Sequence, residues 1–281
     1  MHELLLLLAA AVYFGSTVAY IAYLLVGARP ATARVARIAF AVGLVLHTAA
    51  IAVRCAHGLP PTISAADTLS FYAWALVCGF LAVQLRYHLP TVGSFLSPLV
   101  CLLVLMALAL PKPARPDHPL NKSFESVWFP LHVSLAVAGD VAFVLAAAVG
   151  LMYLIRETSL KNKRSGPVVD RLPSLDLLDR MNRRLITIGF PLLTLGMLTG
   201  GLWILLDPKL KEAVNDPKIL WTLSTWVLYA VLLNGRVLVG LRGRKAALLS
   251  VAGFALVVVT FVAVNLMGGP GMHSFRPVNP S

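Results

Sequence analysis

Two histidines, His132 and His273, are the residues of this chain best suited to hold a metal. His132 comes one turn into the apolar run 128–155, beside Trp128, and His273 follows the Gly-rich elbow 268–271 after the last apolar run. Two neutral imidazoles from separate helices can hold one porphyrin iron between them as axial ligands. The residue types therefore predict a bis-histidine haem site. The alternative is that each ring is an interfacial anchor at a helix end.

Aromatic side chains that could cover the faces of a macrocycle gather in the last third of the chain. They are Trp203, Trp221, Trp226 and Tyr229. Tryptophan and tyrosine also form belts at membrane interfaces, and this is the preferred interpretation for Trp203. Trp221 and Trp226 are the two expected to buttress a bound haem.

The elements that must position these residues are long apolar helices. The chain is 58% hydrophobic and 13% charged, and its mean hydropathy is +0.81, which is not typical of a soluble globular protein. Apolar runs of about 20 residues, enough to cross a bilayer, recur along it. They lie at 4–27, 35–56, 67–87, 92–110, 128–155, 183–206, 218–239 and 247–267. The sequence predicts an all-α polytopic membrane bundle of about eight transmembrane helices, with 1–281 as a single membrane domain.

The basic residues orient this bundle. With an outside N-terminus, loops on one side hold sixteen of the 24 Lys and Arg residues and loops on the other side hold seven. Cytoplasmic loops carry the excess of positive charge, so both termini are expected outside and the connection 156–182 in the cytoplasm. Leucines among its charges suggest a short interfacial helix. His132 and His273 then share the outer side.

Charge and cysteine content narrow the function classes. The net charge of +12 lies mostly in juxtamembrane loops, where it sets topology and contacts anionic lipid headgroups, so nucleic-acid binding is not expected. Cys55, Cys78 and Cys101 form no C-x-x-C pair, which argues against a thiol–disulfide relay. Asp216 and Pro217 are an N-cap and first-turn pair that starts a helix, a structural role that needs no catalysis.

Two stretches carry a family resemblance. Residues 216–236 contain Asp216-Pro217-Lys218, Trp221, Trp226, Tyr229 and Arg236, and residues 265–275 run from Asn265-Leu266 through glycines to His273-Ser274-Phe275. The first resembles the D-P-K-E-x-W-x-L-x-x-W-x-x-Y-A-x-x-L-H-x-R signature of the CcsA/ResC haem-handling proteins of cytochrome c assembly. The second is similar to that family's N-L-x-G-x-G-x-H-S-[YF] ending. The segment from His57 to Trp74 resembles the family's G-x-x-P…E-x-L-x-F-x-x-W connection.

Departures from the family pattern point to one of its branches. The tryptophan-rich W-G-x-x-W-x-W-D run is missing, and Asn234 stands where the family has an intramembrane histidine. The glutamate of the helix two–three connection is Asp67 here. This pattern resembles the HemX-like branch, which also begins near a His-Glu pair such as His2-Glu3.

The resemblance implies a function, a cofactor and partners. It implies a haem-handling protein of the bacterial inner membrane that binds haem b, held by His132 and His273, with Asp216 fixing the start of its helix. A ResB/CcsB-like membrane subunit and apocytochrome c are the implied partners. No autonomous catalysis is expected, at most a part in a haem-attachment complex. The alternatives are a HemX-like regulator of glutamyl-tRNA reductase levels, a non-catalytic assembly subunit, and a small-solute transporter.

Overall fold

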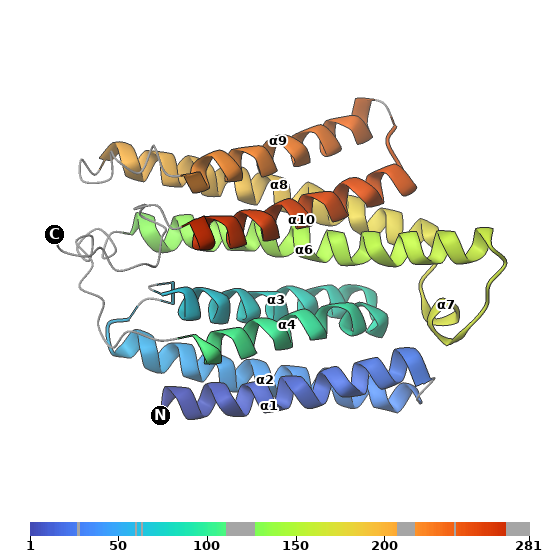
Figure 1. Cartoon of the computed structure of the whole chain (residues 1–281), viewed down its shortest axis with the longest axis horizontal. Coiled ribbons are helices and arrows are strands. Elements are labelled where there is room, and N and C mark those ends of the chain that lie inside the picture. The colour runs from blue at the N-terminus through green and yellow to red at the C-terminus, as the bar shows by residue number, and fades with distance from the viewer. Residues whose placement is uncertain are drawn as a thin grey trace. The chain divides into compact units, whose positions relative to one another are not determined.

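Every one of the eight predicted segments is helical in the computed structural model (Figure 1). The structure describes residues 1–26, 29–59, 61–62, 64–110, 127–206, 217–238 and 240–267, and within these ranges it contains helices and no strand. The long helices are α1 (His2–Ile21), α2 (Pro30–Ala56), α3 (Ala65–Tyr87), α4 (Pro90–Ala109), α6 (Trp128–Lys161), α8 (Leu175–Leu206), α9 (Pro217–Leu238) and α10 (Arg244–Met267). A five-residue π-helix, η1 (Ala22–Val26), continues α1, and α7 (Pro167–Arg171) is a single short turn.

The apolar helices make this a multi-pass membrane protein. Six of them, α1 with η1, α2, α3, α4, α6 and α8, are long and apolar enough to cross a bilayer within the described residues. The described apolar part of α9, Thr222–Gly235, is shorter than a span. The all-α fold is confirmed, whereas the count of eight spans and the side of each terminus stay predictions.

The connection between α6 and α8 is shorter than predicted. Helix α6 continues to Lys161 and α8 begins at Leu175, so the loop 156–182 was predicted too long at both ends. A helix does not stop where its apolar run stops. Exposed (i, i+4) ion pairs, Lys161 with Glu157 and Arg180 with Asp176, support the polar turns.

The short connection is held against the end of α1. The guanidinium of Arg171 lies 4.3 Å from the ring centroid of Tyr23 and donates to the Tyr23 carbonyl. Arg156 donates to the Val169 carbonyl. These contacts supply hydrogen-bond donors to carbonyl groups near a helix end, where intrahelical donors run out.

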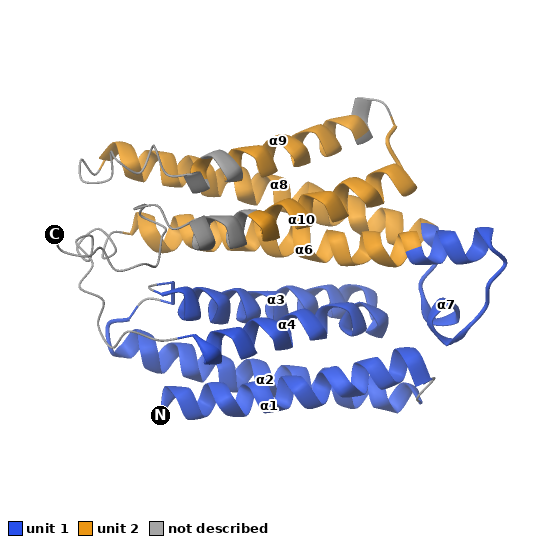
Figure 2. Ribbon diagram, viewed as in Figure 1, with its two compact units in different colours: residues 1–116, 155–175 blue, residues 117–154, 176–281 orange. Residues whose placement is uncertain are grey.

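The chain divides into two compact units (Figure 2). Unit 1 comprises residues 1–116 and 155–175, which include α1 to α4 and α7. Unit 2 comprises 117–154 and 176–281, which include most of α6, α8 from its second residue on, and all of α9 and α10. The single membrane domain 1–281 stays a prediction.

Aromatic rings seated on glycines bring the helices of unit 1 together. A Cβ on Gly43 of α2 would lie 2.5 Å from the Tyr13 ring, and one on Gly93 of α4 would lie 2.6 Å from the Tyr20 ring. Only hydrogen fits at these two positions. Edge-to-face contacts of Tyr13 and Tyr20 with Phe40 complete this centre.

Unit 2 has a polar link among its helices. The side-chain amide of Asn182 on α8 donates to the Ala146 carbonyl of α6 at 2.7 Å and to the Ser250 hydroxyl of α10 at 2.9 Å. Asn182 is 3% exposed and Ser250 is fully buried. Hydrogen bonds of this kind join helices that have no hydrophobic driving force for association in lipid.

Candidate functional site

His132 is fixed by a hydrogen bond from α6 to α8. Its Nδ1 lies 2.7 Å from the carbonyl oxygen of Gly196. A carbonyl oxygen only accepts, so Nδ1 carries the proton and a neutral ring has its lone pair on Nε2. Because a carbonyl on a neighbouring helix orients the ring, the tautomer is set by the fold.

Glycines on both helices allow the close approach that this bond needs. A Cβ on Gly196 would lie 2.9 Å from the Ala136 backbone nitrogen, and one on Gly139 would lie 2.8 Å from that of Leu193. At Gly200 an added Cβ would lie 2.6 Å from His132 Nδ1 itself. The imidazole ring therefore packs directly against the backbone of α8, at a position that has no side chain.

Aromatic side chains lie close to this seat. Phe129, one turn before His132, has its ring centroid 5.7 Å from that of Trp203 on α8. Trp203 is 7% exposed, and its Nε1 has no hydrogen-bond partner among the described residues. The ring is thus packed against a neighbouring helix of unit 2, and the aromatic-belt interpretation of Trp203 stays a prediction.

Trp226 contacts a different face of α8. Its Nε1 donates to Thr194 Oγ1 at 2.9 Å, and its ring lies 5.4 Å from that of Phe190. With 3.6 residues per turn, these contacts lie roughly 120° around α8 from Gly196 and Gly200. Trp226 and His132 thus meet α8 on separate faces.

The other predicted site residues fall partly or wholly outside the described residues. The backbone of Trp221 belongs to α9, but its side chain is not described. Asp216 and His273 also lie outside the described ranges. The pairing of His132 with His273 therefore stays a prediction.

The donor set around His132 fits an axial haem ligand. A histidine that binds metal almost always donates its other ring N–H to a carbonyl or carboxylate, and His132 does so. Within the described ranges, no three His, Cys, Asp or Glu side chains are grouped closely enough to hold a bare metal ion. Ligation of a metal already held by a porphyrin needs only one or two such side chains.

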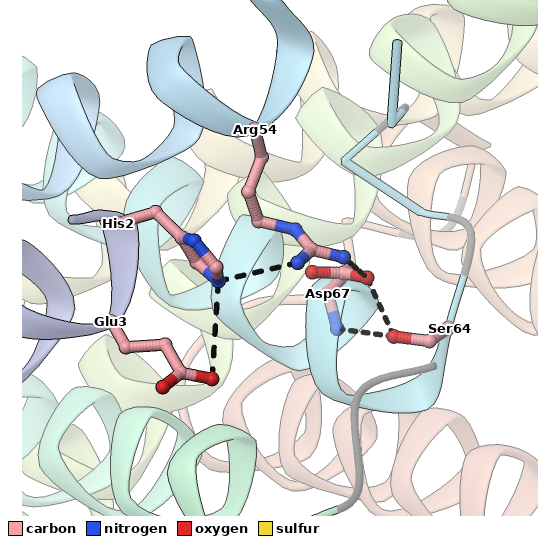
Figure 3. Close-up of polar contacts among 5 residues, drawn as sticks. All are labelled: His2, Glu3, Arg54, Ser64 and Asp67. Carbon is pink, nitrogen blue, oxygen red and sulfur yellow. Dashed lines mark hydrogen bonds and ion pairs between the residues drawn. The ribbon is translucent and has the colours of Figure 1, made fainter. Parts of the chain in front are cut away.

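Sequence reasoning missed a buried ion pair in unit 1 (Figure 3). An Arg54 terminal nitrogen lies 2.6 Å from Asp67 Oδ2, and the two residues are 8% and 4% exposed. Ser64 caps α3 by accepting from the Asp67 N–H, and its hydroxyl donates to Asp67 Oδ2 at 2.6 Å. The other terminal nitrogen of Arg54 donates to His2 Nε2 at 3.4 Å.

One sequence signal could have found half of this cluster. Ser64-x-x-Asp67 is the pattern of an N-cap with an acidic residue in the first turn. It places Asp67 at the start of α3, but it says nothing of Arg54 at the end of α2.

Comparisons with known proteins agree on one family. Residues 62–273 match the family model described as cytochrome C assembly protein. The chain is 32% identical over 234 residues to the cytochrome c biogenesis protein CcsA of Prochlorococcus marinus (strain MIT 9301), which covers 74% of each chain. It is 27% identical to that of Guillardia theta, over 79% of this chain and 78% of the relative, and 28% identical to that of Synechococcus elongatus, over 78% and 79%.

Proposed function

The chain belongs to the cytochrome c assembly protein family, and from that premise we propose that it holds haem for cytochrome c biogenesis between His132 and His273. The observation that supports this most directly is the His132 hydrogen bond. It orients the ring from α8 and puts the lone pair of a neutral ring on Nε2, the nitrogen that would bind iron.

The chain's own residues have distinct parts in this proposal. His132 and His273 would hold the haem iron through their ring nitrogens. Trp221 would cover the macrocycle, Trp226 would buttress it from its own face of α8, and Asp216 would fix the start of α9. Bound haem would supply an iron and a reactive vinyl edge for transfer to a cytochrome. The protein's task is to hold the iron and shield the apolar faces from water.

The finer assignments belong to the same proposal. The haem is haem b, and both histidines lie on the outer face of a bacterial inner membrane that the chain crosses eight times. A ResB/CcsB-like membrane subunit receives or passes on the haem, and apocytochrome c is its destination. The family match supports this place in biogenesis; a regulator of glutamyl-tRNA reductase levels would need no haem ligands.

An absorption spectrum of the detergent-purified chain, reconstituted with haem, tests the proposal. We expect the α and β bands of a six-coordinate, low-spin haem, because two imidazoles are strong axial ligands. His132→Ala and His273→Ala should each leave a five-coordinate or empty site. Added imidazole should partly restore the bands in each variant, because it can enter the vacated axial position.

His57→Ala is the matched control. His57 is an exposed histidine at the end of α2, so its replacement should leave the spectrum unchanged. Absence of low-spin bands in the wild type would refute the bis-histidine site and put the regulatory function first. Bands that survive in both alanine variants would show that other residues hold the haem.

A further inference from the structure

A small pocket lies at the end of unit 1 where α1 begins and α2 ends. Its volume of about 20 Å³ is enough for a single water molecule. Three helices line it with polar groups: His2 on α1, Arg54 on α2, and Asp67 and Ser70 on α3. Three of these four residues are in the ion-pair cluster of Figure 3.

One polar atom at this pocket lacks a protein partner. The Nε of Arg54 is buried with no hydrogen-bond partner among the described residues. Arg54 is 8% exposed, and one of its terminal nitrogens reaches only the long contact of 3.4 Å with His2. Buried polar groups in native proteins are satisfied by protein or by ordered water. The pocket therefore suits water rather than an apolar occupant.

Ser70 connects this pocket to a histidine inside the helices. Ser70 lines the pocket, and its Oγ lies 2.8 Å from Nε2 of His47. His47 is fully buried in α2, about two-thirds of the way along a membrane-spanning helix. Its other ring nitrogen, Nδ1, lies 3.5 Å from the Tyr13 hydroxyl. An ionisable side chain at such a depth is costly and is usually kept for a function.

We propose that the pocket water and Ser70 form a proton path to His47, which makes it a proton-exchanging site within the membrane. Ser70 Oγ passes its proton to His47 Nε2 and takes one from the pocket water, which solvent replenishes. One proton enters, one N–H bond forms, and the hydroxyl and the water are regenerated. The Tyr13 oxygen then accepts from Nδ1–H of the imidazolium.

The electrostatic surroundings of His47 are nearly neutral. The titratable side chain in contact with it is Tyr13 on α1, and beyond Ser70 the pocket is lined by His2 on α1, Arg54 on α2 and Asp67 on α3. Arg54 and Asp67 cancel each other as an ion pair. The fixed cation of this group, Arg54, is thus compensated and does not oppose protonation of the imidazole.

Hydrogen–deuterium exchange at the imidazole C2 position tests the path, because it needs both ring protonation and contact with water. The full chain in lipid nanodiscs is incubated in D₂O over a range of pH, and the exchange of each histidine is read by mass spectrometry. We expect His47 to exchange with a sigmoidal pH profile. Ser70→Ala removes the hydroxyl that relays the proton. It should slow the exchange of His47 by at least about tenfold, because exchange then needs local opening of the bundle.

Two further variants keep the test decisive. Ala50→Leu fills the pocket without removing a polar group, since Ala50 lines it, and it should also slow His47. Ser94→Ala is the control, because Ser94 is an equally buried serine that donates to the Tyr20 carbonyl. The exposed His57 is the internal standard, and its exchange rate should be the same in every sample. Complete protection of His47 at every pH, or a rate unchanged by both Ser70→Ala and Ala50→Leu, would overturn the proposal.

Discussion

The orientation of the His132 ring is set by single atoms on α8. The Gly196 carbonyl selects the tautomer and the missing side chain of Gly200 makes room for the ring. A histidine in the same place without these two features would be a helix-end anchor like many others. The hydrogen bond thus favours the ligand interpretation over the anchor interpretation.

Gly200→Ala tests this seat without touching the ligand. The new Cβ would lie 2.6 Å from Nδ1, so the ring must shift and its bond to Gly196 weakens. Haem affinity should fall by about tenfold or more, as for other losses of an orienting partner of a metal ligand. The measurement is haem titration of the purified variant, followed by its absorption bands.

Gly201→Ala is the control next in the chain. A Cβ there meets nothing within 4 Å, and glycine to alanine inside a helix stabilises by roughly 0.5–1 kcal/mol. Its haem affinity should therefore equal that of the wild type. Equal loss in both variants would mean that helix rigidity, and not the His132 seat, controls haem binding.

The sequence predicted His132 as a haem ligand, but it did not predict which group orients the ring. Its residue type, its place one turn into a span and its aromatic neighbours are local features, and local features are readable from the chain. The Gly196 bond joins positions 64 residues apart, so it depends on which helices meet. The face of α8 that Trp226 contacts depends on the same packing, and this is why its placement could not be predicted.

Elements were predicted more reliably than their ends. All eight helices exist because long apolar runs have few alternatives to a helix in a membrane. Their ends differ because α2, α6 and α8 each extend into polar sequence, where Pro30 starts one helix and ion pairs prolong the other two. Hydropathy detects the part of a helix inside the bilayer and not the turns beyond it.

The Arg54–Asp67 pair is predicted to clamp α2 to α3. Asp67→Ala would leave the Arg54 cation buried without its counter-ion, and breaking a buried pair in this way costs about 3–5 kcal/mol. The midpoint of thermal unfolding in detergent should drop sharply. Asp67→Asn should be less damaging, because the amide oxygen still accepts from Arg54.

A double variant shows whether the instability of Asp67→Ala comes from the unpaired arginine or from altered packing of α3. Replacing both partners with apolar residues, Arg54→Met with Asp67→Leu, removes the buried cation together with its partner. Its stability should return close to that of the wild type. If the double variant is as unstable as Asp67→Ala, the cost comes from the packing of α3 and not from an unpaired arginine.

At the scale of the whole molecule, the basic loops favour one orientation, which stays a prediction. The relatives are matched over about three quarters of their length, so the chain has most of what a cytochrome c biogenesis protein of this kind contains. The haem proposal needs His132 and His273 on the same side of the membrane. That requirement makes topology the property on which the proposed function depends.

Cysteine labelling in sealed vesicles measures this topology. Single cysteines at Ser165, in the α6–α7 connection, and at Ser281 are placed in a chain whose three native cysteines are replaced. A membrane-impermeant maleimide should reach Ser281→Cys from outside and Ser165→Cys only after permeabilisation, because the excess of Lys and Arg predicts a cytoplasmic 162–174 connection. A variant that keeps only Cys55, which is exposed at the last turn of α2, should be labelled from the same side as Ser281→Cys.

If both engineered sites react from one side, the number of spans between them is even. His273 would then lie across the membrane from His132, and a single haem could not join them.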